Sequence, residues 1–464
     1  MRSVIITLLV IVIAVMAVPA QNNARVYYVR LADGEKIDAN PIKEFDAESG
    51  KDGISIRIYP DITFQTIEGI GGAFNEIGGE ALMALDQQQR NEVMKNLFDK
   101  NGASFSLCRT AVGSSDFGMD AYSYSEVPGD YSMKNFSVER EKTSVIPYIK
   151  LAYKYNPKLS LFASPWSPPG WMKESGLMDR GVENPEKNVL KDEPEIYKAY
   201  ALYFSKYVQA YAKEGITVNR LVIQNEQDIS TKYPSCHMPP KQMGEFVINY
   251  MRPQFQKDEL NTEIWAGTFR TAKRLDGLEY VSNKEWREAV DGIGIQYTNA
   301  RQIENMRAIS PEINFLHTEG NCFGGKNSVD QAFSRFDEVA TYINHGVPNF
   351  CYWNMILNET ESSGWGWKQN SLITIDRKNK TVTYNPDYAA MALFGRFMQP
   401  GMKRIAAASW YNETMTLADD SNVYLFLKND SDKEKTFDIW LKDEQANVVD
   451  IPAQSLAVVR ISYN

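Results

Sequence analysis

Short apolar segments alternate with longer amphipathic segments over most of the chain, from about residue 64 to residue 395. Eight of the apolar segments are rich in β-branched and aromatic residues, which is typical of buried strands. They occupy residues 64–74, 103–113, 159–166, 220–226, 263–269, 291–298, 313–320 and 348–355. Because helical segments lie between most of them, the pattern predicts an α/β fold of the (β/α)₈ or TIM barrel type.

Two of the amphipathic segments have apolar residues at a spacing near 3.6, which predicts helices. They are EALMALDQQQRNEVMKNLF at residues 80–98 and EIYKAYALYFSKYVQAYAKEG at residues 195–215. The second segment ends at Gly215, and glycine is common just beyond the last turn of a helix. We therefore expect one continuous helix in each segment.

Both ends of the chain contain strand-like segments without helices between them. ARVYYVR and GISIRIYP lie near the N-terminus, and five further segments follow residue 400. Together they predict a small antiparallel β-sandwich that is discontinuous in the sequence. The expected organisation is a signal peptide at residues 1–20, N-terminal sandwich strands at 21–62, the barrel at 63–395 and C-terminal sandwich strands at 396–464.

The first residues have the pattern of a secretory signal. Arg2 precedes an apolar segment from Val4 to Val18, and the small-residue sequence VPAQ follows, so cleavage is expected after Ala20. The apolar segment is shorter than the roughly 20 residues that span a bilayer. We expect an exported protein (periplasmic, cell-surface or secreted) without stable membrane insertion after cleavage, and an uncleaved anchor is the minor alternative.

The composition narrows the class of partner. The net charge is −9 and no run of Lys and Arg occurs, which argues against nucleic acid as a partner. The many aromatic residues (25 Tyr, 21 Phe and 9 Trp) suit a large core or a sugar-binding cleft. GIGGAF departs from a dinucleotide-binding loop at Phe74, and no Cys/His spacing is typical of zinc. We therefore expect neither a metal nor another cofactor, and the oligomeric state stays open.

Two glutamates stand where predicted strands end. Asn225 and Glu226 end the segment at 220–226, and Glu319 lies near the end of the segment at 313–320. In a (β/α)₈ barrel, catalytic residues lie at the carboxyl ends of the strands. A pair of carboxylates there suits glycoside hydrolysis, with Glu226 as general acid/base, Glu319 as nucleophile and Asn225 as ligand of the sugar 2-hydroxyl. The simpler alternative is that each glutamate is a surface residue at the start of a loop.

Six blocks of the sequence resemble the conserved blocks of glycoside hydrolase family 30, which contains glucosylceramidases, β-1,6-glucanases and β-xylosidases. The blocks are IEGIGGAFNE, LCRTAVGSSDFGMDAYSYSE, LFASPWSPPGWMK, VIQNE, FLHTEG and CYWNMILNE, within roughly residues 60–405. The resemblance implies a (β/α)₈ barrel of clan A and a retaining mechanism. It places the acid/base after Asn at the end of strand four and the nucleophile at the end of strand seven, which are Glu226 and Glu319 here.

The resemblance also gives roles to other residues. Arg109 would bond the nucleophile, Asp116 and Trp166 would bind sugar hydroxyls, Tyr297 would approach the nucleophile, and Trp353 would form the floor of the sugar site. Arg109 could instead form a purely structural ion pair, and the tryptophans could be core residues. Trp365 and Trp367 are weaker candidates for a distal subsite or lid.

Two departures from the family bear on the substrate. Gln227 follows the acid/base where relatives often have Pro, and the block HTEG also differs from the glucosylceramidase branch. The expected enzyme is a secreted retaining β-glycosidase acting on β-D-glucosyl linkages of a β-1,6-glucan or a glucosylceramide-like glycolipid. A β-xylosidase is the alternative within the family, and a non-catalytic carbohydrate-binding protein is the alternative from another class.

The cysteines offer further hypotheses. GNCFG at residues 320–324 fits a nucleophile elbow around Cys322, which would need one of the chain's three histidines as its base. Cys236 and Cys322 could also pair, which the sequence leaves open.

Overall fold

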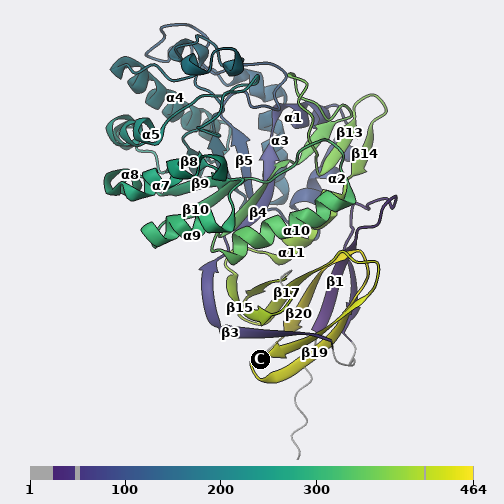
Figure 1. The fold of residues 1–464 in the computed structure, drawn as a ribbon. Coiled ribbons are helices and arrows are strands. Elements are labelled where there is room, and N and C mark those ends of the chain that lie inside the picture. Colours follow the sequence, from purple (N-terminus) through teal and green to yellow (C-terminus); the bar gives the residue numbers. More distant parts are fainter. Residues whose placement is uncertain (1–23, 48–52, 412–413, 463–464) are drawn as a thin grey trace, which may run out of the picture.

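The computed structural model describes residues 24–47, 53–411 and 414–462. An eight-stranded parallel sheet forms the barrel, in the order β10-β9-β8-β7-β6-β5-β4-β11. Its strands are β4 (Gly69–Phe74), β5 (Leu107–Ala111), β6 (Ser160–Ser164), β7 (Arg220–Val222), β8 (Glu263–Phe269), β9 (Gly292–Gln296), β10 (Phe315–Glu319) and β11 (Asn349–Asn354). Each lies within one of the eight predicted segments, so the predicted barrel is confirmed (Figure 1).

The barrel closes where β10 meets β11. The backbone N–H of Cys351 donates to His317 Nδ1 at 3.1 Å, and the His317 backbone N–H donates to Asn349 Oδ1 at 2.8 Å. One residue from each of six strands contributes to an apolar cluster inside the barrel, formed by Leu107, Phe162, Val222, Trp265, Leu316 and Cys351. His317 is thus a structural residue at this junction of β10 and β11, since its ring also stacks on Phe350 (4.2 Å) and contacts Tyr342 (4.1 Å).

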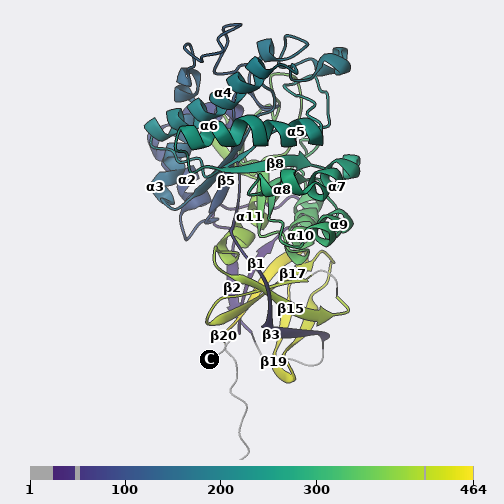
Figure 2. The ribbon, with the colours of Figure 1, turned by 90° about the vertical axis from the view of Figure 1, so that its left-hand side faces the viewer.

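Helices cover the outside of the barrel, as the view turned by 90° shows for α4, α5 and α6 (Figure 2). They are α1 (Glu76–Met83), α2 (Gln87–Phe98), α3 (Val145–Tyr155), α4 (Pro194–Lys213), α5 (Pro240–Phe246), α6 (Arg252–Lys257), α7 (Arg274–Ser282), α8 (Lys284–Glu288), α9 (Ala300–Ile309), α10 (Val329–Asn344) and α11 (Pro386–Phe397).

The prediction of one helix over residues 80–98 is wrong, because the segment forms the end of α1 and all of α2. Asp86 is the N-cap of α2 and separates the two helices. Its side chain accepts a hydrogen bond from the Gln89 backbone N–H, and the Gln89 side chain accepts one from the Asp86 backbone N–H, which is a capping box. The helix predicted over residues 195–215 is confirmed as α4, and Gly215 beyond its end has a φ of +77°.

A nine-stranded, mostly antiparallel sheet lies below the barrel in Figure 1, in the order β19-β18-β3-β15-β16-β17-β20-β1-β2. It takes β1 (Ala24–Arg30), β2 (Lys43–Asp46) and β3 (Ile54–Thr66) from the N-terminal part of the chain. The other six are β15 (Lys403–Ser409), β16 (Thr414–Ala418), β17 (Asn422–Asn429), β18 (Lys435–Leu441), β19 (Glu444–Ile451) and β20 (Ser455–Ser462). The sheet curls over one core, since Val26 of β1 and Val449 of β19 join the same apolar cluster.

Two details of this region differ from the sequence prediction. Residues 64–66 belong to β3 of the sandwich rather than to the first barrel strand, and β2 and β19 were not predicted as strands. A further three-stranded sheet, β12 (Ile356–Asn358), β13 (Ile373–Asp376) and β14 (Thr381–Tyr384), follows the last barrel strand.

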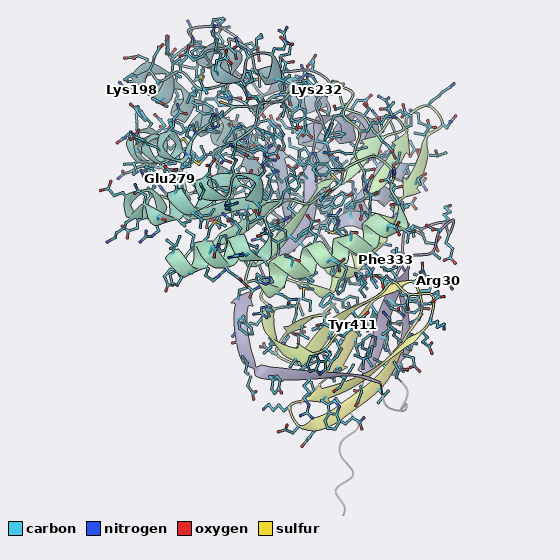
Figure 3. The ribbon with its side chains drawn as sticks, viewed as in Figure 1. Arg30, Lys198, Lys232, Glu279, Phe333 and Tyr411 are labelled. Atoms are coloured by element: carbon cyan, nitrogen blue, oxygen red, sulfur yellow. The ribbon has the colours of Figure 1, made fainter. Side chains whose placement is uncertain are left out.

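The barrel and the sandwich meet through α10 and α11. Phe394 of α11 stacks on Phe426 of β17 with ring centroids 5.9 Å apart. Lys232, in the loop after β7, lies at the end of the barrel away from the sandwich (Figure 3). None of the helices in the described part of the chain has the length and apolar character needed to cross a membrane.

Candidate active site

Glu226 lies just beyond the carboxyl end of β7. The backbone N–H groups of Ile223 and Gln224 still bond to β8, after which the chain turns into the mouth of the barrel. Glu226 has a φ of +42°, which is uncommon for a residue with a side chain. Its own backbone N–H donates to Thr268 Oγ1 at 2.9 Å, and this contact holds the turn.

The Glu226 side chain is buried and bonds one cation. Its Oε1 accepts from Arg270 Nη1 at 2.9 Å. Burial raises the pKa of Glu226 to about 8; Arg270 opposes the rise, whereas the negative charges of Glu319 and Asp228 add to it. This carboxyl therefore tends to keep its proton near neutral pH.

Glu319, the last residue of β10, has different partners. Its Oε2 accepts from Arg109 Nη1 at 2.7 Å, and its Oε1 accepts from the Tyr297 hydroxyl. Burial raises the pKa of Glu319 too, but the Arg109 charge and the Tyr297 hydrogen bond both lower it. Each oxygen of Glu319 thus accepts a hydrogen bond, and both bonds favour the ionised form of this carboxyl group.

Arg109, on β5, is fully buried and organises the floor of this site. Its Nε and Nη2 both donate to Ser164 Oγ, Nη1 also donates to the Thr318 carbonyl at 3.0 Å, and Nη2 donates to Asn225 Oδ1 at 2.7 Å. All its N–H groups are therefore engaged. Because the Asn225 oxygen is used by Arg109, the amide nitrogen of Asn225 is the end left to meet a ligand.

Two stacked indoles form one wall beside Arg109. The rings of Trp166 and Trp353 lie 4.9 Å apart at 26°, and the Arg109 guanidinium lies 4.5 Å from the Trp166 centroid. Asp116 Oδ1 and Trp353 Nε1 are buried and have no fully formed hydrogen bond within the described residues, although the Trp353 side chain lies close enough to Asp116 to lower the pKa of that carboxyl. Burial raises the pKa of Asp116 well above its usual range, as do the nearby charges of Glu319 and Glu226. A ligand with hydroxyl groups would satisfy both polar atoms.

The structure adds residues that sequence reasoning did not identify. An arc of aromatic rings runs from Tyr297 to Phe323 (5.4 Å), to Trp367 (6.2 Å) and to Tyr233 (6.3 Å). Burial raises the pKa of Tyr233, and the negative charges of Glu226, Asp116 and Glu319 raise it further, which places Tyr233 beside the site. The arc includes Trp367, one of the weaker candidates, whereas the Trp365 indole N–H donates to Asp179 at 3.1 Å.

The cysteine hypotheses find no support in the geometry. All four cysteines are free and buried, so Cys236 and Cys322 do not pair. Cys322 Sγ lies 3.2 Å from Gln369 Oε1, and burial raises the pKa of its thiol. Among the described residues, no histidine forms a hydrogen bond with Cys322. His317 serves the junction of β10 and β11, and His345 Nδ1 contacts the Thr341 carbonyl.

We expect iodoacetamide to leave the hydrolytic activity of the folded protein unchanged, because a buried thiol with a raised pKa is a poor nucleophile. The measurement is the residual activity after treatment, with the alkylated positions identified by mass spectrometry. Loss of activity in proportion to alkylation of Cys322 would restore the cysteine hypothesis.

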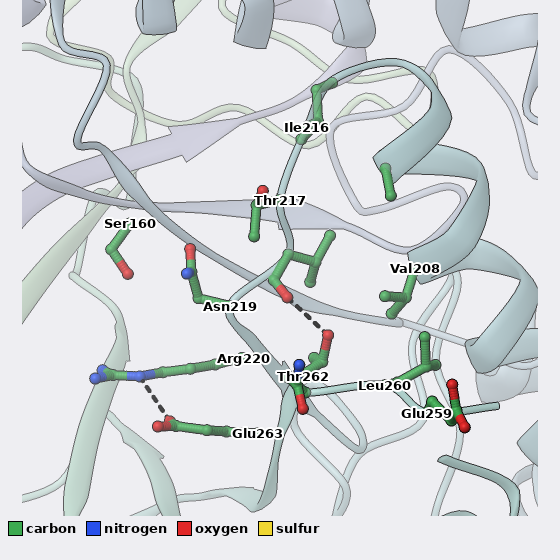
Figure 4. A pocket seen from close by; sticks show the side chains of 13 residues that line it. Ser160, Val208, Ile216, Thr217, Asn219, Arg220, Glu259, Leu260, Thr262 and Glu263 are labelled. Carbon is green, nitrogen blue, oxygen red and sulfur yellow. Dashed lines mark hydrogen bonds and ion pairs between the residues drawn. The ribbon is translucent and has the colours of Figure 1, made fainter. Parts of the chain in front are cut away.

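A separate cavity of about 430 Å³ lies at the opposite end of the barrel, where β6, β7 and β8 begin (Figure 4). Three charged residues line it, Arg220, Glu259 and Glu263, and Arg220 already pairs with Glu263 at 3.0 Å and with Glu68 at 2.6 Å. Because the cavity lies at the amino ends of the strands, whereas catalytic residues of such barrels lie at the carboxyl ends, the candidate site stays with Glu226 and Glu319.

Comparison with known proteins gives consistent matches. Residues 67–398 match the Glycosyl hydrolase family 30 TIM-barrel domain. The chain is 28% identical over 419 residues to putative glucosylceramidase 3 of Caenorhabditis elegans, covering 83% of this chain and 77% of that protein. It is 27% identical over 365 residues to endo-1,6-β-D-glucanase neg1 of Aspergillus fumigatus, covering 73% and 71%. The solved endo-β1,6-glucanase BT3312 has a TM-score of 0.82 and 21% identity, over 95% of this chain and 100% of that chain.

Proposed function

We propose that the protein hydrolyses β-D-glucosyl linkages with retention of the anomeric configuration. The premise is that the chain belongs to glycosyl hydrolase family 30. It is therefore a glycoside hydrolase with a carbohydrate or glycolipid substrate. In this proposal Glu319 is the nucleophile and Glu226 is the general acid/base. The observation that carries it is the difference between the two carboxyl groups. Glu319 is bonded by Arg109 and Tyr297, while burial holds the pKa of Glu226 at about 8.

The reaction takes two steps. Glu319 attacks the anomeric carbon while Glu226 gives its proton to the departing glycosidic oxygen, and a covalent glycosyl–enzyme intermediate forms. Glu226, now a carboxylate, removes a proton from water, and the water oxygen displaces Glu319 from the anomeric carbon. Retention requires the two carboxyl groups to lie about 5–5.5 Å apart.

The surrounding residues suit a sugar in this position. The stacked Trp166–Trp353 pair forms a buried apolar wall, and beside it Asp116 Oδ1 and Trp353 Nε1 are polar atoms that sugar hydroxyl groups could satisfy. The Asn225 amide nitrogen would donate to the 2-hydroxyl, a contact that strengthens in the transition state. Arg109 fixes the positions of the Asn225 and Glu319 side chains relative to each other, since it donates a hydrogen bond to both.

The proposed leaving group is either a second glucose through a 1→6 linkage or a ceramide. The names of the two curated relatives support both, one being a putative glucosylceramidase and the other an endo-1,6-β-D-glucanase. Within the same family, a β-xylosidase is the alternative. We also propose export after cleavage behind Ala20, a position that lies outside the described residues.

A panel of substrates tests the proposal. Purified protein is incubated separately with a β-1,6-glucan, other β-glucans, a β-xylan and glucosylceramide, and the released sugars are identified. We expect glucose or glucose oligomers from the β-1,6-glucan or glucose from glucosylceramide. Xylose release would move the assignment to a β-xylosidase, and binding without any release would favour a carbohydrate-binding protein.

A further inference from the structure

Arg270 bonds two carboxylates at once. It follows β8, the strand beside β7, and its side chain is largely buried. Its Nε and Nη2 donate to the two oxygens of Asp228 at 2.9 and 2.8 Å, and its Nη1 donates to Glu226 Oε1 at 2.9 Å. Sequence analysis assigned no role to Arg270 or to Asp228.

Asp228 fixes the direction of the third bond. A two-point contact between guanidinium and carboxylate sets the plane of the arginine head, so Nη1 has little freedom of its own. The Asp228 side chain is 2% exposed and therefore committed to this contact. The neighbouring Gln227 side chain donates to Asp276 Oδ2 at 3.0 Å and anchors the same turn. Gln227 and Asp228 thus fix the loop after Glu226. Gln227 itself stands at the position where relatives often have Pro.

The bond to Oε1 decides which oxygen of Glu226 carries the proton. The carbonyl oxygen of a neutral carboxyl group is a better acceptor than its hydroxyl oxygen, so the guanidinium N–H at Oε1 favours the form with the hydrogen on the other oxygen. Within the part of the chain that the structure describes, no hydrogen bond goes to Glu226 Oε2. We propose that Arg270, positioned by Asp228, keeps the acid proton of Glu226 on Oε2 and directs it to the leaving group.

This proposal rests on the proposed function. In the first step the proton leaves Oε2 for the glycosidic oxygen as the bond from that oxygen to the anomeric carbon breaks and Glu319 bonds the carbon. Glu226 becomes a carboxylate beside the Arg270 cation, which stabilises it until it takes a proton from water. Arg270 acts on the reaction through its hydrogen bond to Glu226, so it is a positioning residue.

The two partners act on Glu226 with opposite signs. The Arg270 charge lowers the pKa of Glu226 and the Asp228 charge raises it. The other charged and titratable groups that interact with Glu226 come from several elements and stay the same in both variants: Glu319, Arg109, Asp116, Tyr233 and Tyr297. Removing each charge in turn should therefore move the titration of Glu226 in opposite directions.

The first test measures this titration without relying on activity. Protein labelled with ¹³C at the glutamate carboxyls is titrated by NMR, and the Glu226 signal is assigned as the one lost in Glu226→Gln. We expect Arg270→Gln to raise the midpoint by roughly one pH unit or more and Asp228→Asn to lower it. Arg252→Gln, which removes the ion pair between α6 and Asp291 just before β9, is the control and should change nothing. Equal shifts in both site variants, or none, would overturn the proposal.

The second test separates positioning from folding. β-Glucosides with poor and with activated leaving groups are compared at one pH. We expect Arg270→Gln to lower kcat/KM for the poor leaving group by roughly tenfold or more and to spare the activated one, which needs no proton. An equal loss for both substrates would indicate a merely structural role. If the wild type is inactive on every glucoside, the proposed function fails, and the NMR titration still decides what Arg270 does to Glu226.

Discussion

Replacing Glu319 by Gln lowers kcat/KM by at least roughly 10⁴-fold in our account. The amide cannot form the covalent bond to the anomeric carbon, and its one oxygen can accept only one of the two hydrogen bonds that Arg109 and Tyr297 now donate to separate oxygens. The measurement is initial-rate kinetics of Glu319→Gln on whichever substrate the panel identifies, with circular dichroism to show that the variant is folded.

Glu279→Gln is the matched control for this variant. Glu279 lies exposed on α7, on the outer layer of the barrel (Figure 3). The same change of a carboxylate to an amide should leave kcat/KM unaltered there. If Glu319→Gln kept a substantial part of the wild-type rate, the nucleophile would have to be another residue.

Replacing Glu226 by Ala should affect substrates unequally. For a substrate with a poor leaving group we expect a loss of roughly 10²–10⁴-fold, because the departing oxygen receives no proton. A dinitrophenyl β-glucoside leaves without protonation, so its covalent intermediate should still form and then persist, since no base activates water. The measurement is kcat and kcat/KM of Glu226→Ala on both substrates.

Azide provides the control for Glu226→Ala, since this anion attacks the intermediate without needing a base. Added azide should restore turnover of the dinitrophenyl glucoside and give a β-glucosyl azide. The wild-type protein should show no such acceleration. An α-configured azide, or equal losses on both substrates, would contradict the assignment of Glu226 as acid/base in a retaining enzyme.

The barrel could be predicted from the sequence because its strands are buried on both sides. Each therefore appears as a continuous apolar segment, bounded by residues that cannot remain in the interior. Glu226 and Glu319 stand out for a related reason, since each is a charge at the carboxyl end of such a segment. β2 and β19 were missed because their residues are largely exposed or half-buried and lack a regular apolar pattern.

Several residues that surround the two glutamates could not be predicted from sequence patterns. Arg270 is one of 50 Lys and Arg residues, and nothing local marks it, because its partners Glu226 and Asp228 belong to the preceding strand's loop. Tyr233 and Phe323 join the site only through contacts between loops of different strands. Their role depends on tertiary packing, which composition and periodicity do not reveal.

The most direct measurement is to trap the intermediate. The protein is incubated with a 2-fluoro-β-glucosyl fluoride, whose fluorine slows the second step more than the first, and peptides are analysed by mass spectrometry. Our account predicts one fluoroglucosyl group per chain, attached to Glu319, and no labelling of Glu319→Gln. A label on Glu226 or on another residue, or hydrolysis of the fluoride without any covalent adduct, would contradict the two-glutamate retaining mechanism.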